Sequence, residues 1–403
     1  MIYIFILILF LIFIYKYDYE RSNKGKTVCW IIMLILLICV AGFRYRMGND
    51  SIKYENYYKW QQHDLFGLNA DDFKDTRFAP LYVVLSASCR FFSEEFMMLQ
   101  FVVSTIVNCS VFLFLWKNTR NVFFAGMLYY FFLYLNLNME VLREALAVSV
   151  FLFSWPYFKD GKWFRYYVCA IFAFLFHISA VFMLILPLIT LPGVKWFFSF
   201  GLRTWIICII VLGLSFAVNV YLFDFVQTIA LTENMAERAE VYSKMDISGS
   251  TLNVLGIAMR FAKFVFYPLV ALYFVKVWSK YNDNINKRLE AMILMSVYIS
   301  IMTIGVSLFI RYNNYFLFFY IIILSDWCFS YLKWKNRLYR LSFVQWLLIF
   351  VPLLSLQVYT AYWSNYNKSG TLKYYMMFYP YSNQFDKELD GNREKMIKYS
   401  RRY

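Results

Sequence analysis

The sequence contains few of the residues from which metal centres and interdomain linkers are usually built. Its 403 residues include only two histidines, 14 glycines and seven prolines, and charged residues make up 16%. The scarcity of histidine argues against a histidine-based metal cluster. The scarcity of glycine and proline argues against flexible linkers between domains. We therefore expect no metal, no other cofactor, and a single domain spanning 1–403.

Cysteine is present, but not in patterns that indicate disulfides or metal sites. The seven cysteines stand in or beside apolar segments and never at CxxC spacing. This favours small buried side chains. The first residues, MIYIFILILF, lack the basic region and cleavage site of a signal peptide, so we expect a retained first span. The cysteines are Cys29, Cys39, Cys89, Cys109, Cys169, Cys208 and Cys328.

Hydrophobic residues dominate instead, at 61% of the chain, and aromatic residues reach 23%. Apolar runs of about 16–25 residues recur, long enough to cross a hydrocarbon core of roughly 30 Å. Lipid offers no partners to backbone N–H and C=O groups, so these runs must be helices. The composition predicts an all-α, polytopic integral membrane protein with about 10–12 transmembrane helices plus re-entrant segments. The apolar segments are 1–15, 28–43, 78–92, 96–116, 122–139, 141–158, 166–190, 204–222, 254–278, 291–310, 312–332 and 341–360.

The net charge of +15 arises mostly between these segments. There it orients a membrane protein and meets anionic lipid, so it does not indicate nucleic acid as a partner. Lys and Arg in the first loop, 16–26, place that loop in the cytoplasm, and the basic loops 276–288 and 333–340 also belong there. The predicted outward-facing pieces are then the loops 44–77 and 223–253 and the tail 361–403.

The topology is ambiguous around 78–92 and 166–190. If each crosses the membrane once, the two basic loops between them lie outside, against the positive-inside rule. We prefer 78–92 as a half-crossing segment and 166–190 as a helix broken at His177-Ile178-Ser179. Such a break is tolerable where the backbone lines a cavity in the protein. This topology places Arg143 at the outer face.

The segment 41–58, AGFRYRMGNDSIKYENYY, is the most informative part of the chain. Arg44 and Arg46, a Gly48-Asn49-Asp50 turn and Tyr54 follow directly on an apolar span. Guanidinium groups and aromatic rings at a bilayer surface suit a ligand with phosphates and sugar rings. Asp50 is the first candidate for a base or hydrogen-bond acceptor, because the turn holds it beside two arginines. The alternative is a residue that only shapes the turn.

Arg143 lies in NMEVLREALA, between Glu140 and Glu144. An ionisable residue facing a membrane cavity is costly and is a functional candidate by default. Its planar guanidinium can hold a phosphate in bidentate fashion. The alternative is an Arg–Glu pair that anchors the helix at the interface.

Three further positions have weaker signals. Arg311 lies between two apolar runs and is followed by Tyr312 and Tyr315, so we interpret it as a ligand contact or as a snorkelling anchor. Arg260, with Lys263 nearby, is a secondary phosphate contact. His177, in LFHISAVF, is either a hydrogen-bonded structural residue or a donor or proton carrier.

At these residues the chain resembles the EpsG-like, Wzy-type bacterial polysaccharide polymerases. The resemblance lies in a G-x-D-x-x-x-Y core (Gly48, Asp50, Tyr54), VLREALAVSVFLFS, FHISAVFMLILPL and RYNNYF, in the order of the family. The family usually has Gln where Glu144 stands here.

The resemblance implies a GT-C-like membrane glycosyltransferase that works without a metal. It would join undecaprenyl-pyrophosphate-linked oligosaccharide repeat units into capsule, exopolysaccharide or O-antigen, at the outer face of the bacterial inner membrane. Arg143 and Arg311 would neutralise the pyrophosphate leaving group, with Arg44 and Arg46 assisting. Tyr54, Glu140, Arg260, Tyr312 and Tyr315 complete the predicted substrate contacts. Asp50 or His177 would orient the acceptor hydroxyl.

Rival functions share much of this pattern. An O-antigen-type ligase would show nearly all of these features. A flippase or other transporter often has internal repeats, and we find none. A membrane acyltransferase should have a catalytic histidine with polar neighbours, whereas His177 has apolar ones. A flippase and a chain-length regulator are candidate partners of a polymerase.

Overall fold

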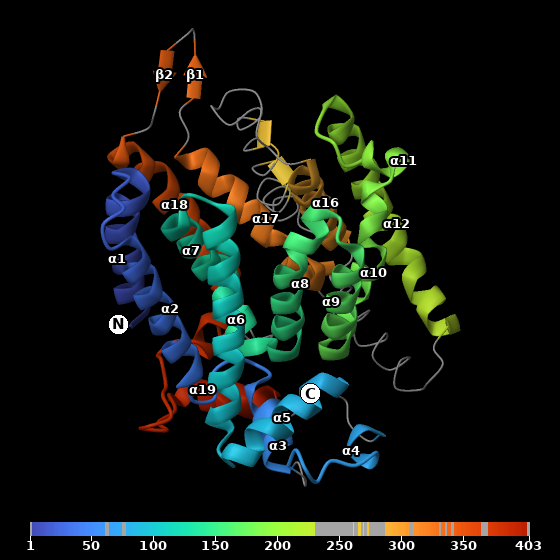
Figure 1. Cartoon of the computed structure of the whole chain (residues 1–403). Coiled ribbons are helices and arrows are strands. Elements are labelled where there is room, and N and C mark those ends of the chain that lie inside the picture. The colour runs from blue at the N-terminus through green and yellow to red at the C-terminus, as the bar shows by residue number, and fades with distance from the viewer. Residues whose placement is uncertain are drawn as a thin grey trace. The chain divides into compact units, whose positions relative to one another are not determined.

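The computed structural model describes residues 2–60, 64–74, 78–229, 261, 265–266, 269, 272–273, 287–305, 309–329, 332–334, 337–339, 342–363 and 370–400. The chain forms two compact units, whose α-helices and strands are labelled in Figure 1. Unit 1 comprises Met1–Leu184 and Leu341–Tyr403, and unit 2 comprises Ile185–Arg340. The predicted helical architecture is confirmed in both, with one exception among the described residues. That exception is an antiparallel hairpin, β1 (Leu332–Trp334) and β2 (Arg337–Tyr339), which overlaps the predicted cytoplasmic loop 333–340.

The elements of unit 1 are α1 (Ile2–Phe13), η1 (Ile14–Tyr19), α2 (Lys26–Gly42), α3 (Ser51–Trp60), α4 (Asp71–Lys74), α5 (Pro80–Phe92), α6 (Phe96–Asn118), α7 (Val122–Tyr129), η2 (Tyr130–Tyr134), η3 (Asn136–Glu140), α8 (Leu142–Asp160), α9 (Trp163–Phe176), η4 (Ile178–Val181), α18 (Phe343–Tyr362), η10 (Tyr374–Met377) and α19 (Gly391–Ser400). Helix α10 (Phe182–Ile185) leads into unit 2. The elements of unit 2 are η5 (Leu186–Thr190), α11 (Pro192–Lys195), α12 (Leu202–Ile229), α16 (Lys287–Gly305), α17 (Ile310–Cys328), β1 and β2.

Two helical stretches of the described chain are long and apolar enough to span a membrane. They are Ile2–Tyr19, which joins α1 to η1, and α6. Six further apolar helices are shorter, at 10–17 residues. The prediction of about 10–12 transmembrane helices is therefore not confirmed in number.

The exposed surface of α1 is nevertheless apolar. On α1, Ile4, Ile8 and Ile12 form an i, i+4 row with 60%, 49% and 53% of their surface exposed. Ile6 and Phe10 of the same helix are fully buried. An exposed isoleucine row is unfavourable in water and favourable against acyl chains.

The predicted break in the segment 166–190 is present. Helix α9 ends at Phe176, and the chain continues through an extended His177 into η4. The His177 side chain caps η4, because Nδ1 accepts a hydrogen bond from the Ser179 amide at 3.1 Å. Helix α5 has 13 residues, about 20 Å in length, which is too short to cross a bilayer. The break at His177 and the short helix α5 are the two features that the half-crossing topology requires. The orientation in the membrane stays a prediction.

A closed ring of three hydrogen bonds ties α6 to the helix that precedes the candidate site. Asn108 Nδ2 donates to Asn138 Oδ1 at 2.7 Å. Asn138 Nδ2 donates to the Tyr129 hydroxyl at 2.8 Å, and that hydroxyl donates to Asn108 Oδ1 at 3.0 Å. All three residues are buried, and both asparagine amides also donate to backbone carbonyls, at Ser104 and Tyr134. The ring therefore fixes the position of η3 against α6.

We expect Asn108→Ala to lower the stability of the detergent-solubilised protein by about 1–3 kcal/mol, because it leaves the Tyr129 hydroxyl and Asn138 Oδ1 without their partner. Ser110→Ala is the matched control, since Ser110 lies on the same helix and donates to its own backbone at Ile106. Thermal unfolding monitored by size-exclusion chromatography measures both. Equal melting temperatures for the two variants would show that the ring does not stabilise the fold.

Candidate functional site

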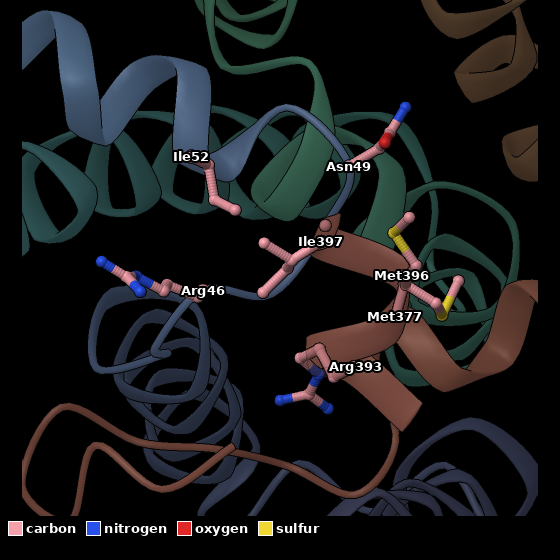
Figure 2. Close-up of a pocket in the computed structure, with 8 residues that line it drawn as sticks. Arg46, Asn49, Ile52, Met377, Arg393, Met396 and Ile397 are labelled. Atoms are coloured by element: carbon pink, nitrogen blue, oxygen red, sulfur yellow. The ribbon is translucent and has the colours of Figure 1, made fainter. Parts of the chain in front are cut away.

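The candidate site lies at one end of unit 1, where the loop 43–50 meets the C-terminal segment. The loop and the C-terminal segment are joined by backbone hydrogen bonds from Tyr45 N to Ser382 O at 2.9 Å and from Gln384 N to Phe43 O at 2.8 Å. Figure 2 shows a small pocket there, lined by Arg46 and Asn49 from the loop and by Arg393 and Met396 from α19. The C-terminal segment is thus part of this end of the unit.

Arg44 carries a buried positive charge in the loop. Its side chain is fully buried and donates to the Ala41 carbonyl at the C-terminal end of α2, where the helix dipole is negative. Nε and the second terminal nitrogen have no hydrogen-bond partner in the part of the chain that the structure describes. Burial lowers the pKa of Arg44 to about 10, so the group stays protonated at neutral pH. A charge held in this way favours a bound anion.

Tyr82 of α5 is a buried tyrosine near two arginines of the site. The ring is fully buried, and its hydroxyl has no partner among the described residues. It is close enough to interact electrostatically with both Arg44 and Arg143. Sequence analysis missed Tyr82, because a tyrosine inside an apolar run looks like any other core residue.

Arg143 stands in the first turn of α8, and two aromatic rings lie near its guanidinium group. Its guanidinium carbon lies 4.7 Å from the centroid of Phe78 and 6.0 Å from that of Tyr54. Burial raises the pKa of Tyr54, and the nearby Arg143 opposes that shift. Two residues predicted from separate motifs, Tyr54 and Arg143, therefore come together in one cluster.

The Gly48-Asn49-Asp50 turn packs on η3. Gly48 has φ +88°, and a Cβ there would clash with the Met139 carbonyl, so only glycine fits. Asp50 forms an exposed ion pair with Lys53 at 2.9 Å. Its predicted role toward an acceptor hydroxyl stays a prediction.

Arg46 is engaged by an acidic residue of α3. Its Nε and a terminal nitrogen donate to the two carboxylate oxygens of Glu55 at 2.9 and 3.3 Å, and Lys59 donates to the same carboxylate at 2.6 Å. Burial alone would raise the pKa of Glu55, but these two cations outweigh it and hold the pKa below its ordinary value. Binding of substrate by Arg46, as predicted, would require this pair to open.

Glu140 ends η3 and is covered by the C-terminal segment. The residue is 9% exposed, and both carboxylate oxygens accept from the Tyr374 hydroxyl at 2.6 Å. Burial raises the pKa of Glu140 to about 7, against hydrogen bonds from Tyr374 and the Asn49 backbone that lower it. Tyr374 is 234 positions away in sequence, so no local pattern could have found it.

The remaining predicted residues are His177 of unit 1, three residues of unit 2, and Arg260. The Nδ1 atom of His177 is occupied by the Ser179 amide and lies 2.6 Å from the Ser179 hydroxyl, which is the structural role considered as the alternative. Arg311, Tyr312 and Tyr315 belong to α17 in unit 2, and Tyr315 is fully buried there. Arg260 lies outside the described residues. The roles of these residues toward a substrate stay predictions.

Replacing Gly48 with alanine should destabilise the protein by roughly 2–4 kcal/mol. This sums the penalty for a left-handed backbone with a side chain and that for overpacking against Met139. Gly391→Ala is the control, since a Cβ there meets no atom within 4 Å. The yield of monodisperse protein and its melting temperature give the readout. If both variants behave like wild type, the turn is not packed on η3 as described.

Comparison with known proteins identifies the family. No characterised protein and no solved structure matches the chain. The profile of the EpsG family matches residues 27–383, which confirms the resemblance expected from the motifs. This family, together with the apolar helices, indicates a membrane protein with a role in polysaccharide biosynthesis. The chain belongs to the EpsG family.

Proposed function

We propose that the protein is a polysaccharide polymerase of the bacterial inner membrane. In this proposal it transfers a growing glycan from undecaprenyl pyrophosphate onto the terminal sugar of an incoming lipid-linked repeat unit, at the outer face and without a metal. The product is a capsule, an exopolysaccharide or an O-antigen.

The buried, unpaired charge of Arg44 is the observation that carries this proposal, together with Tyr82, which interacts electrostatically with both Arg44 and Arg143. Among the described residues, no carboxylate pairs with Arg44. An undecaprenyl pyrophosphate leaving group brings the negative charge that this cluster lacks. As the bond to the sugar breaks, charge develops on the pyrophosphate, and fixed cations in a site of low dielectric stabilise it strongly.

The aromatic rings around Arg143 suit the sugar part of the substrate. Phe78 lies 4.0 Å from Tyr57 and 5.3 Å from Tyr82, measured between ring centroids. Together with Tyr54 they form an aromatic group next to a guanidinium. Sugar rings bury their apolar faces against such rings, while phosphates pair with the arginine.

Arg311, Tyr312 and Tyr315 of unit 2 are proposed as further contacts, on the motif RYNNYF alone. A ligase that transfers a finished chain would use the same pyrophosphate chemistry, and a flippase would bind the same lipid. These two remain the alternatives.

The test is a gel of surface polysaccharide from cells that lack the gene and are complemented with variants. Arg44→Ala and Arg143→Ala should each abolish the ladder of long chains and leave single repeat units on the surface lipid. Arg143→Lys should lose most activity, on the order of 10²-fold, because lysine cannot hold a phosphate in bidentate fashion. Lys395→Ala removes an exposed positive charge from α19 and should leave the ladder intact.

The pattern of failure separates the alternatives. If repeat units never reach the surface in the null strain, a flippase is the better interpretation. If long chains accumulate on the lipid carrier but are not attached to their acceptor, the protein is a ligase. A normal ladder in the null strain would overturn both the polymerase and the ligase.

A further inference from the structure

The Glu140 carboxylate is a buried acid of the site, and its surroundings differ from those of Glu55 and Asp50. Glu55 is paired with Arg46 and Lys59, and Asp50 is paired with Lys53. Within the described residues, Glu140 has no basic partner and is bound by the Tyr374 phenol alone among side chains. A buried carboxylate without a cation is unfavourable for stability, so a purely structural role would be better served by glutamine.

Glu140 lies next to the elements that carry the arginines of the site. It precedes Arg143 by three residues, at the junction of η3 and α8. The Gly48 turn covers it, since a Cβ at Gly48 would lie 3.3 Å from Glu140 Cγ. The carboxylate is thus anchored by the same turn that follows Arg44 and Arg46, next to the helix that presents Arg143.

We propose that Glu140 is the proton acceptor in the transfer step, and that Tyr374 is the residue that positions it. This inference rests on the proposed function. The acceptor hydroxyl oxygen attacks the anomeric carbon of the donor sugar and forms a new C–O bond. The bond from that carbon to the pyrophosphate breaks, and its electron pair leaves with the lipid pyrophosphate. The hydroxyl proton passes to the Glu140 carboxylate and from there to water, which restores the base.

The electrostatics of the site fit a base that works near neutral pH. Burial raises the pKa of Glu140 to about 7, into the range in which a carboxylate can accept a proton and release it near neutral pH. The titratable groups that face it are Asp50 from the turn, Tyr362 from the end of α18 and Tyr374 from η10. Of these, Asp50 raises the pKa of Glu140, whereas the hydrogen bond from Tyr374 lowers it.

Two variants test the two roles in full-length protein reconstituted with lipid-linked repeat units from polymerase-deficient cells. Glu140→Gln should lower kcat by 10²–10⁴-fold with little change in KM, because it removes the base and leaves the arginines in place. Tyr374→Phe should move the acid limb of the pH–rate profile upward by about half to one pH unit, because the carboxylate loses its stabilising hydrogen bond.

Another glutamate and another tyrosine provide matched controls for these two substitutions. Glu95→Gln removes an exposed carboxylate at the start of α6, and Tyr375→Phe keeps the ring that stacks on Trp363 at 5.0 Å. Both should leave kcat and the pH profile unchanged. Folding is checked by size-exclusion chromatography and by the thermal shift that farnesyl pyrophosphate produces, which Glu140→Gln should retain.

The outcomes are distinguishable. Wild-type protein that makes no polymer overturns the proposed function. If the wild-type protein makes polymer and the kcat of Glu140→Gln lies within threefold of the wild-type value, the role of Glu140 alone is overturned. Should Glu140→Gln fail to fold, the Tyr374→Phe profile decides: an upward shift supports the inference, and an unmoved acid limb overturns it.

Discussion

The constraint on which this structure depends is the burial of opposite charges that are not paired with each other. Arg44 and Glu140 both lie at one end of unit 1, and each is shielded from solvent. Neither is neutralised by a partner of opposite charge within the described chain. Such an arrangement is unfavourable for folding, because each group loses hydration without regaining it from a counterion. A protein keeps such groups where a ligand supplies the missing charge or where a reaction needs it.

Holding these groups in place requires rigid neighbours, and the fold provides them from distant parts of the chain. The Asn108–Asn138–Tyr129 ring fixes η3 to α6, and η3 ends in Glu140. Gly48 then allows the loop to lie directly on η3. Finally, the C-terminal segment contacts the end of η3, because the Tyr374 hydroxyl donates to the Glu140 carboxylate. A small displacement of η3 would therefore move the acid and the turn together, and it would also move the start of α8 with Arg143.

Local sequence features predicted part of this site, and tertiary contacts determine the rest. The helical class, the break at His177 and the choice of Arg143 and Tyr54 as separate candidates follow from composition, turn residues and the cost of charge in a membrane, whereas the contact between these two residues was not predicted. The pairing of Arg46 with Glu55 was not predicted, although the nine-residue separation joins a loop to the next helix. Tyr82 and Tyr374 could not be found in this way, since neither stands in a distinctive motif and both depend on long-range packing. The predicted number of transmembrane helices is not confirmed among the described residues, where several apolar runs that look continuous in sequence are divided by breaks and π-helical turns.

Burial acts on acid and base in opposite directions, and this links the two halves of the proposed reaction. It lowers the pKa of the Arg44 guanidinium and raises that of the Glu140 carboxyl. The arginine remains charged after its shift, so it keeps its capacity to stabilise a leaving group. The carboxyl, shifted to about 7, reaches the range in which an acid can both take a proton and release it to water at neutral pH. One property of the environment, its low dielectric, thus strengthens the cation as an anion binder and tunes the carboxylate as a base. An exposed site with the same residues would retain the charges but lose both effects.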